Sequence, residues 1–201
     1  MTEPFEILPP TEEAAHIVPP AKWLRNLFYI HIASIVLSLP TLIFINNPVT
    51  PWLGNALSAG IALCLFYLAP ANTRFRTAAI LTVVSVGLSV LSQLMPNSLL
   101  TIGISILSII AAYQEFHGHA EIIEEKDPKL SRRWKNLFVW QIVIGVIAGF
   151  SSVAAVVIMV LAEMDLDRIT TWVAGAVILV SLIPGVLYLV YLRRMIALVE
   201  E

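Results

Sequence analysis

The chain is poor in charged residues and in cysteine. Only 13% of its 201 residues are Asp, Glu, Lys or Arg, whereas soluble domains have about 25%, and so few charges could not cover the surface of a globule in water. The single cysteine, Cys64, excludes a disulfide within the chain. A net charge of −2 gives no indication of the basic surface that a nucleic-acid partner needs.

Hydrophobic residues make up 58% of the chain and gather in six long runs. Each run approximates the 17–25 residues (about 30 Å) that a helix needs to cross hydrocarbon. None has the polar alternation of a membrane-spanning strand. The sequence therefore predicts an all-α, polytopic integral membrane protein with six transmembrane helices. The expected spans are 24–45, 52–69, 77–95, 99–116, 137–161 and 170–192.

The sequence predicts three regions. Residues 1–22 are acidic and rich in proline, which is typical of a disordered segment. Residues 23–195 are expected to form the six-helix transmembrane domain. Residues 196–201 are expected to be a short tail on the same side as the first.

Positive charge gathers on one side of the predicted membrane. Lys and Arg flank the first and last runs and fill the connections between the second and third runs and between the fourth and fifth; only Arg168 lies on the other side. The positive-inside rule then predicts that both termini are cytoplasmic. Trp23 and Trp134 are expected at the inner interface, and Trp52 and Trp172 at the outer one.

The fourth and fifth helices are predicted to extend into the cytoplasm as a hairpin. Residues 115–126 contain no helix breaker except Gly118, and Asp127-Pro128 has the pattern of an N-cap followed by proline at the first helical position. Acidic side chains on one arm could meet basic side chains on the other. The candidate partner-binding residues are Glu121, Glu124, Glu125, Arg132 and Arg133.

The same segment contains the candidate metal ligands Glu115, His117, His119 and Glu121. Glu115 and His119 share one helix face, as do His117 and Glu121. Imidazole and carboxylate together could bind Zn²⁺, Mn²⁺ or Fe²⁺. The two pairs point about 160° apart, so the four do not form one site. The alternative is a polar helix segment that emerges into water with His–Glu ion pairs.

Polar residues within the apolar runs are few. No Asp, Glu, Lys or Arg is expected between the two interfaces, which argues against proton- or ion-coupled transport. His31, Gln93 and Gln141 could line a solute cavity, or they could form hydrogen bonds between helices. Pro40 and Pro184 could break their helices at a transporter's midplane site.

Two resemblances bear on the setting. The stretch from Tyr113 to Glu121, followed by Leu130-Ser-Arg-Arg-Trp134, is similar to small multi-pass membrane proteins of unknown function in Firmicutes, where a Tyr/Glu/His/Glu cluster precedes a Leu-Ser-x-Lys/Arg-Trp element. This resemblance implies a bacterial plasma membrane and no activity. In size and number of spans, the chain also resembles the vitamin-binding S-components of energy-coupling-factor transporters.

Three functions are open on the sequence. The first is a non-enzymatic membrane component that binds a protein partner through the hairpin. The second is a binding or transport subunit for a small, largely apolar solute, and the third is a metal-dependent site at the cytoplasmic surface. The sequence has no Gly-x-Ser-x-Gly or His-Glu-x-x-His motif, so no enzyme is expected. The lipid bilayer is the expected partner, and no cofactor is expected beyond the candidate metal.

Overall fold

The protein is all-α. The computed structural model describes residues 21–41, 49–162 and 166–200, and these residues form helices without any strand. The helices are α1 (Ala21–Thr41), α2 (Val49–Leu68), α3 (Thr73–Leu94), α4 (Ser98–Ile123), α5 (Pro128–Ala162) and α6 (Leu166–Glu200). The all-α prediction is confirmed, and each predicted run corresponds to one helix. The N-terminal tail is predicted to be disordered, and its residues 1–20 lie outside the described part of the chain.

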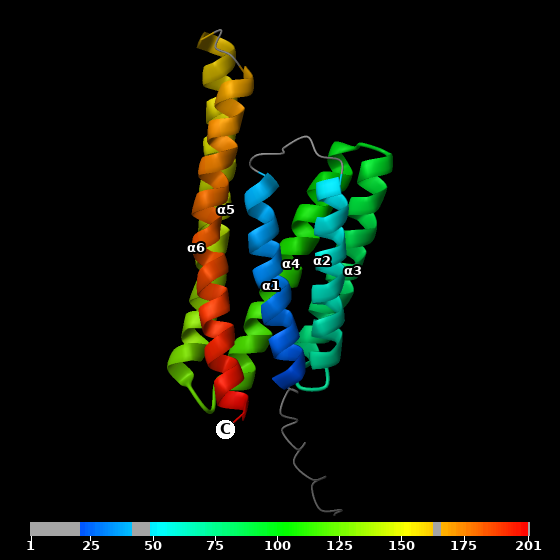
Figure 1. Cartoon of the computed structure of the whole chain (residues 1–201), viewed down its shortest axis with the longest axis vertical. Helices are drawn as coiled ribbons and strands as arrows, with labels where there is room; N and C mark the ends of the chain where they lie inside the picture. The colour runs from blue at the N-terminus through cyan, green and yellow to red at the C-terminus, as the bar shows by residue number, and fades with distance from the viewer. Residues whose placement is uncertain (1–20, 42–48, 163–165, 201) are drawn as a thin grey trace, which may run out of the picture.

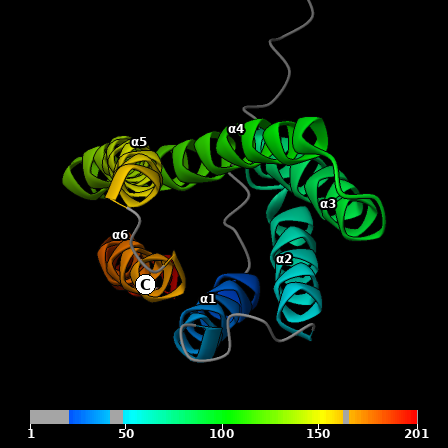
Figure 2. The same cartoon turned by 90° about the horizontal axis from the view of Figure 1, so that it is seen from above.

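The helices stand side by side in a ring (Figures 1 and 2). Each helix packs against the next one along the chain, and α6 packs against α1 to close the ring. Short connections make consecutive helices run in opposite directions. One end of the bundle, at the bottom of Figure 1, therefore contains the N-termini of α1, α3 and α5 and the C-termini of α2, α4 and α6. We call this end the hairpin end, because it contains the α4–α5 connection.

The tightly packed core lies at the hairpin end. Its fully buried side chains come from the first or last three turns of the helices: Leu24, Leu27, Leu65, Leu68, Phe75, Ile123, Leu130, Trp134, Leu192 and Met195. Farther from this end, large apolar side chains such as Leu99 and Phe150 are 76% and 74% exposed. An apolar surface of this extent is unfavourable in water and suits lipid.

Five helices in the described chain are long and apolar enough to cross a membrane. They are α2, α3, α4, the Pro128–Ser151 part of α5 and the Leu182–Glu200 part of α6. Helix α1, described over Ala21–Thr41, contains Arg25, Asn26 and His31 and is not among them. Apolar helices of this length indicate a membrane protein.

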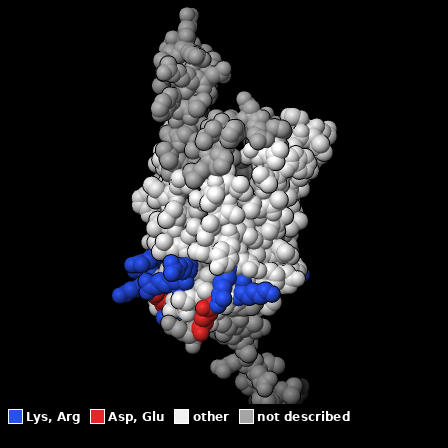
Figure 3. Space-filling view, viewed as in Figure 1, with Lys and Arg blue, Asp and Glu red and all other residues white. Residues whose placement is uncertain are grey.

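Charged side chains form a band at the hairpin end. Figure 3 shows Lys, Arg, Asp and Glu gathered there, with an uncharged described surface above them on this face. Apart from Arg168, in the first turn of α6, the described Lys and Arg residues lie in the first turns of α1, α3 and α5, the last turns of α6, and the α4–α5 connection. Polar groups are thus separated from the apolar part of the helices, as an interface with water requires.

The hairpin has the predicted start of its second helix and only part of its predicted ion pairing, and its first helix ends three residues before the expected Lys126. Helix α4 ends at Ile123 and α5 begins at Pro128. Lys135 Nζ lies 3.3 Å from Glu124 Oε2, but Arg74 of α3 pairs with Glu121 at 2.7 Å. We find no ion pair of Arg132 or Arg133 with the described residues. These two arginines are exposed because α5 turns Leu130, Ser131 and Trp134 inward instead.

The end of α6 is attached to the hairpin and to α1. Residues 196–200, predicted to be a tail, are the last turns of this helix. Arg194 Nη2 lies 2.7 Å from Asp127 Oδ2, and Lys126 Nζ donates to the carbonyl oxygen of Leu198 at 2.6 Å. Arg25 forms an ion pair with Glu200. These contacts link three helices at the hairpin end.

Asp127 is expected to make the stability of the hairpin depend on pH. Its Oδ1 accepts the N–H of Leu130 at 3.0 Å; this bond, together with Arg194, holds the pKa of its carboxyl below the usual value. A lowered pKa in the folded state stabilises the fold above the unfolded pKa, and this contribution disappears as pH falls through the folded pKa. Asn caps helices about as well as Asp, so Asp127→Asn removes only the charge.

We therefore expect Asp127→Asn to have a lower melting temperature than wild type at neutral pH, and we expect this difference to shrink as the pH falls below about 3.9, the usual pKa of Asp. Melting temperatures measured across this range in one detergent test the prediction. Glu124→Gln, which removes only an exposed pair with Lys135, is the control and should change little. A deficit of Asp127→Asn that is the same at every pH would contradict the assignment.

Candidate functional site

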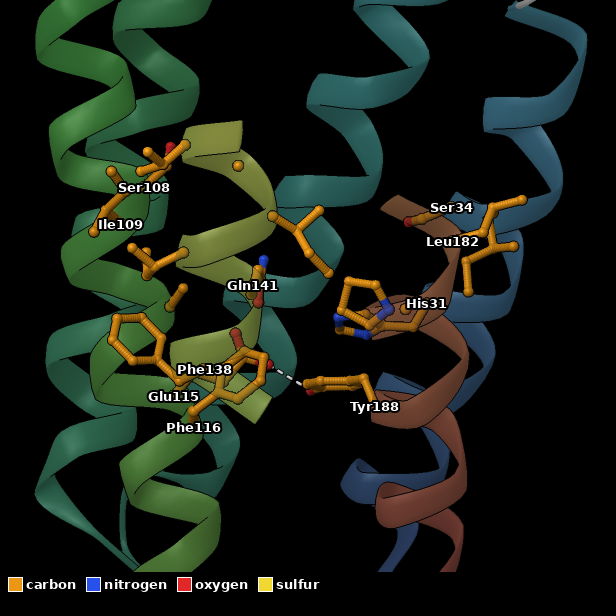
Figure 4. A pocket seen from close by; sticks show the side chains of 18 residues that line it. His31, Ser34, Ser108, Ile109, Glu115, Phe116, Phe138, Gln141, Leu182 and Tyr188 are labelled. Carbon is orange, nitrogen blue, oxygen red and sulfur yellow. Dashed lines mark hydrogen bonds between the residues drawn. The ribbon is translucent and has the colours of Figure 1, made fainter. Parts of the chain in front are cut away.

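A pocket of about 800 Å³ lies between α1, α4, α5 and α6 (Figure 4). Sites for small ligands commonly have about 300–1,000 Å³. Most of its lining is apolar, and its polar side chains are His31, Ser34, Ser108, Glu115, Gln141 and Tyr188. The part of the lining that is nearest to the hairpin end lies next to the packed core. It contains Glu115, His31 and Tyr188.

The apolar part of the pocket lies farther from the hairpin end. It is lined by Ile35, Ile109, Val146 and Leu182, one from each of the four helices. Helix α6 continues through Pro184, which also lines the pocket. Next to this proline, a Cβ on Gly185 would lie 3.3 Å from Ile35 Cδ1, so the glycine allows α1 and α6 to approach closely.

Among the described residues, Glu115 is the only acidic side chain in the pocket lining. It is 9% exposed, and its Oε1 accepts a hydrogen bond from the Tyr188 hydroxyl at 2.5 Å, which joins α4 to α6 (Figure 4). His119, one turn along α4, places Nε2 3.3 Å from the Tyr188 hydroxyl and 3.8 Å from Glu115 Oε1. A buried carboxylate is costly unless it is paired. The described lining residues include no Lys or Arg.

His31 lies beside Tyr188 on the α1 side of the pocket. The two rings stack with centroids 4.2 Å apart and an interplanar angle of 20°. His31 Nδ1 lies 2.9 Å from the carbonyl oxygen of Leu27. Since a carbonyl only accepts, Nδ1 carries the hydrogen, and Nε2 of the neutral ring is an acceptor.

Aromatic rings surround Glu115 and support it. The ring centroid of Phe116 lies 5.5 Å from that of Tyr188 and 6.0 Å from that of Phe138, and all three side chains line the pocket. Toward the core, Trp134 stacks on His119 with centroids 4.7 Å apart. Close packing of large rings fixes their positions, so the polar end of the pocket is preformed.

The structure brings together two of the three predicted solute-binding residues. His31 and Gln141 both line the pocket, and Figure 4 shows Gln141 above Phe138 and Glu115 in that view. Gln93 belongs to α3, which contributes no residue to the lining. This pocket therefore does not bring Gln93 together with the other two.

The four candidate metal ligands do not meet. Glu121 is held by Arg74 and Asn72, and His117 Nδ1 lies 2.9 Å from the carbonyl oxygen of its own helix at Tyr113. His119 is fully buried and Glu115 faces Tyr188. Residues two apart on a helix point to nearly opposite sides, which explains the separation. Within the described residues, no group of three or more His, Cys, Asp or Glu could hold a metal ion.

The sequence analysis misses the environment of Glu115. It predicts an interior without charged residues, and the structure corrects this, since Glu115 is buried among the helices. The burial of Glu115 could have been predicted from its position within the fourth apolar run, one helical turn before His119. The partner on α6, Tyr188, lies 73 residues away, and no local pattern relates the two.

Comparison with known proteins adds no name to this site. No protein-family model, curated protein or solved structure matches the chain. The function therefore has to be inferred from the pocket and its side chains.

Proposed function

We propose that the protein is a membrane-embedded binding or transport protein for a small, largely apolar solute, which it holds between α1, α4, α5 and α6. The observation that carries this proposal is the pocket of about 800 Å³, with apolar walls and a few polar side chains at one end. Ligand sites typically combine these features, because apolar walls supply affinity and a few polar groups fix orientation. The proposed role is non-enzymatic.

We place the six helices across a bacterial plasma membrane, with the hairpin end and both termini in the cytoplasm. The band of Lys and Arg at the hairpin end supports this orientation under the positive-inside rule. The apolar surface above the band supports contact with lipid. The choice of a bacterial plasma membrane is part of this proposal.

Filling the pocket tests the proposal without knowledge of the solute. Gly145 lines the pocket, and a Cβ there would meet no atom within 4 Å, so Gly145→Phe should occupy the pocket without a clash. Gly87 of α3 is equally unobstructed and lies outside the lining, so Gly87→Phe is the matched control. Each protein is purified in nanodiscs, and its bound small molecules are extracted and identified by mass spectrometry.

We expect one small molecule to accompany wild type and Gly87→Phe in about equimolar amount and to be absent from Gly145→Phe. Bulky side chains in a binding pocket exclude ligands by overlap. If the three extracts have the same composition, the pocket is not a solute site and the proposal is wrong.

A second candidate function is partner binding by the hairpin. Arg132 and Arg133 are exposed on α5, and the described chain supplies neither with an ion pair, so they are open to an acidic partner. Reversing both charges should abolish recovery of a partner from mild detergent, and Lys135→Glu, which breaks only the pair with Glu124, is the control. Equal recovery by all three proteins would reject this role.

A further inference from the structure

Around Glu115, the side chains of His31, Ser34 and Tyr188 leave mainly hydrogen-bond acceptors for a ligand. The His31 Nδ1–H and the Ser34 hydroxyl both donate to backbone carbonyls of α1, at Leu27 and Ile30, each at 2.9 Å. The Tyr188 hydroxyl donates to Glu115. These three donors are therefore used within the protein, and what remains of these side chains is the lone pair of His31 Nε2, the Ser34 oxygen and the second carboxylate oxygen of Glu115. The other two polar side chains of the lining, Ser108 and Gln141, can both donate and accept. Such a site suits a ligand that brings hydrogen-bond donors.

Glu115 keeps an oxygen for such a ligand. Its Oε1 accepts from Tyr188, whereas Oε2 accepts no hydrogen bond within the described residues. The carboxyl also lines the pocket, so Oε2 is the atom that a solute can reach. An anion whose described neighbours in the lining include no Lys or Arg favours a ligand of opposite charge.

His119 does not neutralise Glu115. It is fully buried, and its Nδ1 has no hydrogen-bond partner in the described part of the chain. A protonated ring would leave an Nδ1–H donor buried and unsatisfied, which is costly. The neutral ring instead donates its Nε2–H to the Tyr188 oxygen, and Tyr188 donates to Glu115. Hydrogen bonds in such a chain strengthen one another and support the anionic carboxylate.

The aromatic side chains add a second attraction for a cation. Phe116, Phe138 and Tyr188 line the pocket beside Glu115. The faces of aromatic rings are negative and attract ammonium groups within about 6 Å. A carboxylate among aromatic rings is thus complementary to an organic cation, whereas a metal ion would require more oxygen ligands than this site has.

We propose that the solute is a protonated amine with an apolar body, with its ammonium group bound by Glu115 and the neighbouring aromatic rings. Its N–H groups donate to Glu115 Oε2 and His31 Nε2, and its apolar body extends toward Val146 and Leu182. This inference rests on the proposed function, because the amine occupies the same pocket.

The test compares two probes that differ only in the head group. 4-Phenylbutylamine is cationic at neutral pH, and 4-phenylbutan-1-ol is uncharged. Dissociation constants of both tritiated probes are measured by scintillation proximity, with the protein in phosphatidylcholine nanodiscs. Wild type should bind the amine at least about tenfold more tightly than the alcohol, as expected for one charge-assisted hydrogen bond.

Variants then assign the preference to Glu115. Glu115→Gln, which keeps the size of the side chain, should lose the preference for the amine, so that amine and alcohol bind with affinities within about twofold of each other. Retained binding of the alcohol shows that this variant is folded. The comparison of the two probes on wild type needs no variant, so it decides the inference even if Glu115→Gln does not fold.

The outcomes separate the two proposals. Equal, saturable binding of amine and alcohol, weakened in Gly145→Phe, would overturn the amine inference and leave the proposed function standing. An amine preference that persists in Glu115→Gln would also overturn the inference. Binding of neither probe, or binding that Gly145→Phe does not weaken, would contradict the proposed function itself.

Discussion

Trp134→Ala is expected to destabilise the protein by about 3–5 kcal/mol, the usual loss when a large buried aromatic ring is truncated. Trp134 is fully buried, with 0% of its surface exposed. Its ring stacks on His119 at 4.7 Å and makes edge contacts with Tyr188 and Phe116 at 5.1 and 5.7 Å. The cavity would therefore open where α4, α5 and α6 meet beneath the pocket.

The measurement uses the single cysteine of the chain. Cys64 is 2% exposed, so a fluorogenic maleimide reacts with it only when the bundle opens, and the reaction on heating gives a melting temperature. Trp140→Ala on the same helix is the control, since this tryptophan is 62% exposed. Trp140→Ala should melt close to wild type. Equal losses in the two variants would show that Trp134 is not a core residue.

Gly118→Leu is expected to cost about 1–3 kcal/mol, the typical penalty for overpacking a core. A Cβ on Gly118 would lie 3.0 Å from Cε1 and 3.2 Å from Cδ1 of the Phe75 ring. Phe75 is fully buried and also makes an edge contact with His119 at 5.0 Å, so it cannot move aside freely. A leucine would push α3 and α4 apart.

Gly103→Leu on the same helix is the matched control. A Cβ there would meet no atom within 4 Å. Because glycine in a helix interior lowers the stability of the fold by roughly 0.5–1 kcal/mol relative to residues with better helix propensity, Gly103→Leu should be stabilising. The two substitutions should therefore shift the melting temperature in opposite directions. A Gly118→Leu variant as stable as Gly103→Leu would contradict the close contact between Phe75 and α4.

The helices could be predicted because the solvent imposes their length. A run that crosses hydrocarbon must satisfy its backbone internally and must be apolar along about 20 residues, and both properties are visible in the sequence. The hairpin was predictable for a similar local reason, since Asp127 and Pro128 are adjacent and determine where α5 begins.

The contacts between helices could not be predicted, because they depend on how each helix is rotated in the ring. Arg74 is close enough to Glu121 to bind it only once α3 packs on α4, and this contact removes Glu121 from the predicted pairing with the second arm of the hairpin. Glu115 meets Tyr188 only because α4 and α6 lie on opposite sides of one pocket. Neither distance follows from spacing along one helix.

The buried carboxylate also changes what can be inferred about function. An interior without charge argues against transport that is coupled to a proton or another ion. Glu115 removes that objection, because it is an acidic group inside the bundle whose side chain lines the pocket. The protein can therefore be considered for coupled as well as for passive movement of a cationic solute.

Both proposals for the pocket require that lipid surrounds the helix ring and that the hairpin end lies in the cytoplasm. Labelling with a membrane-impermeant maleimide tests this most directly, in a Cys64→Ser background with one new cysteine at Asn97, in the α3–α4 turn, or at Lys129, in the hairpin; both positions are exposed. In intact cells, Asn97→Cys should be labelled, and Lys129→Cys only after permeabilisation. Labelling of Lys129→Cys in intact cells, or recovery of the unmodified chain in the soluble fraction without detergent, would contradict the account.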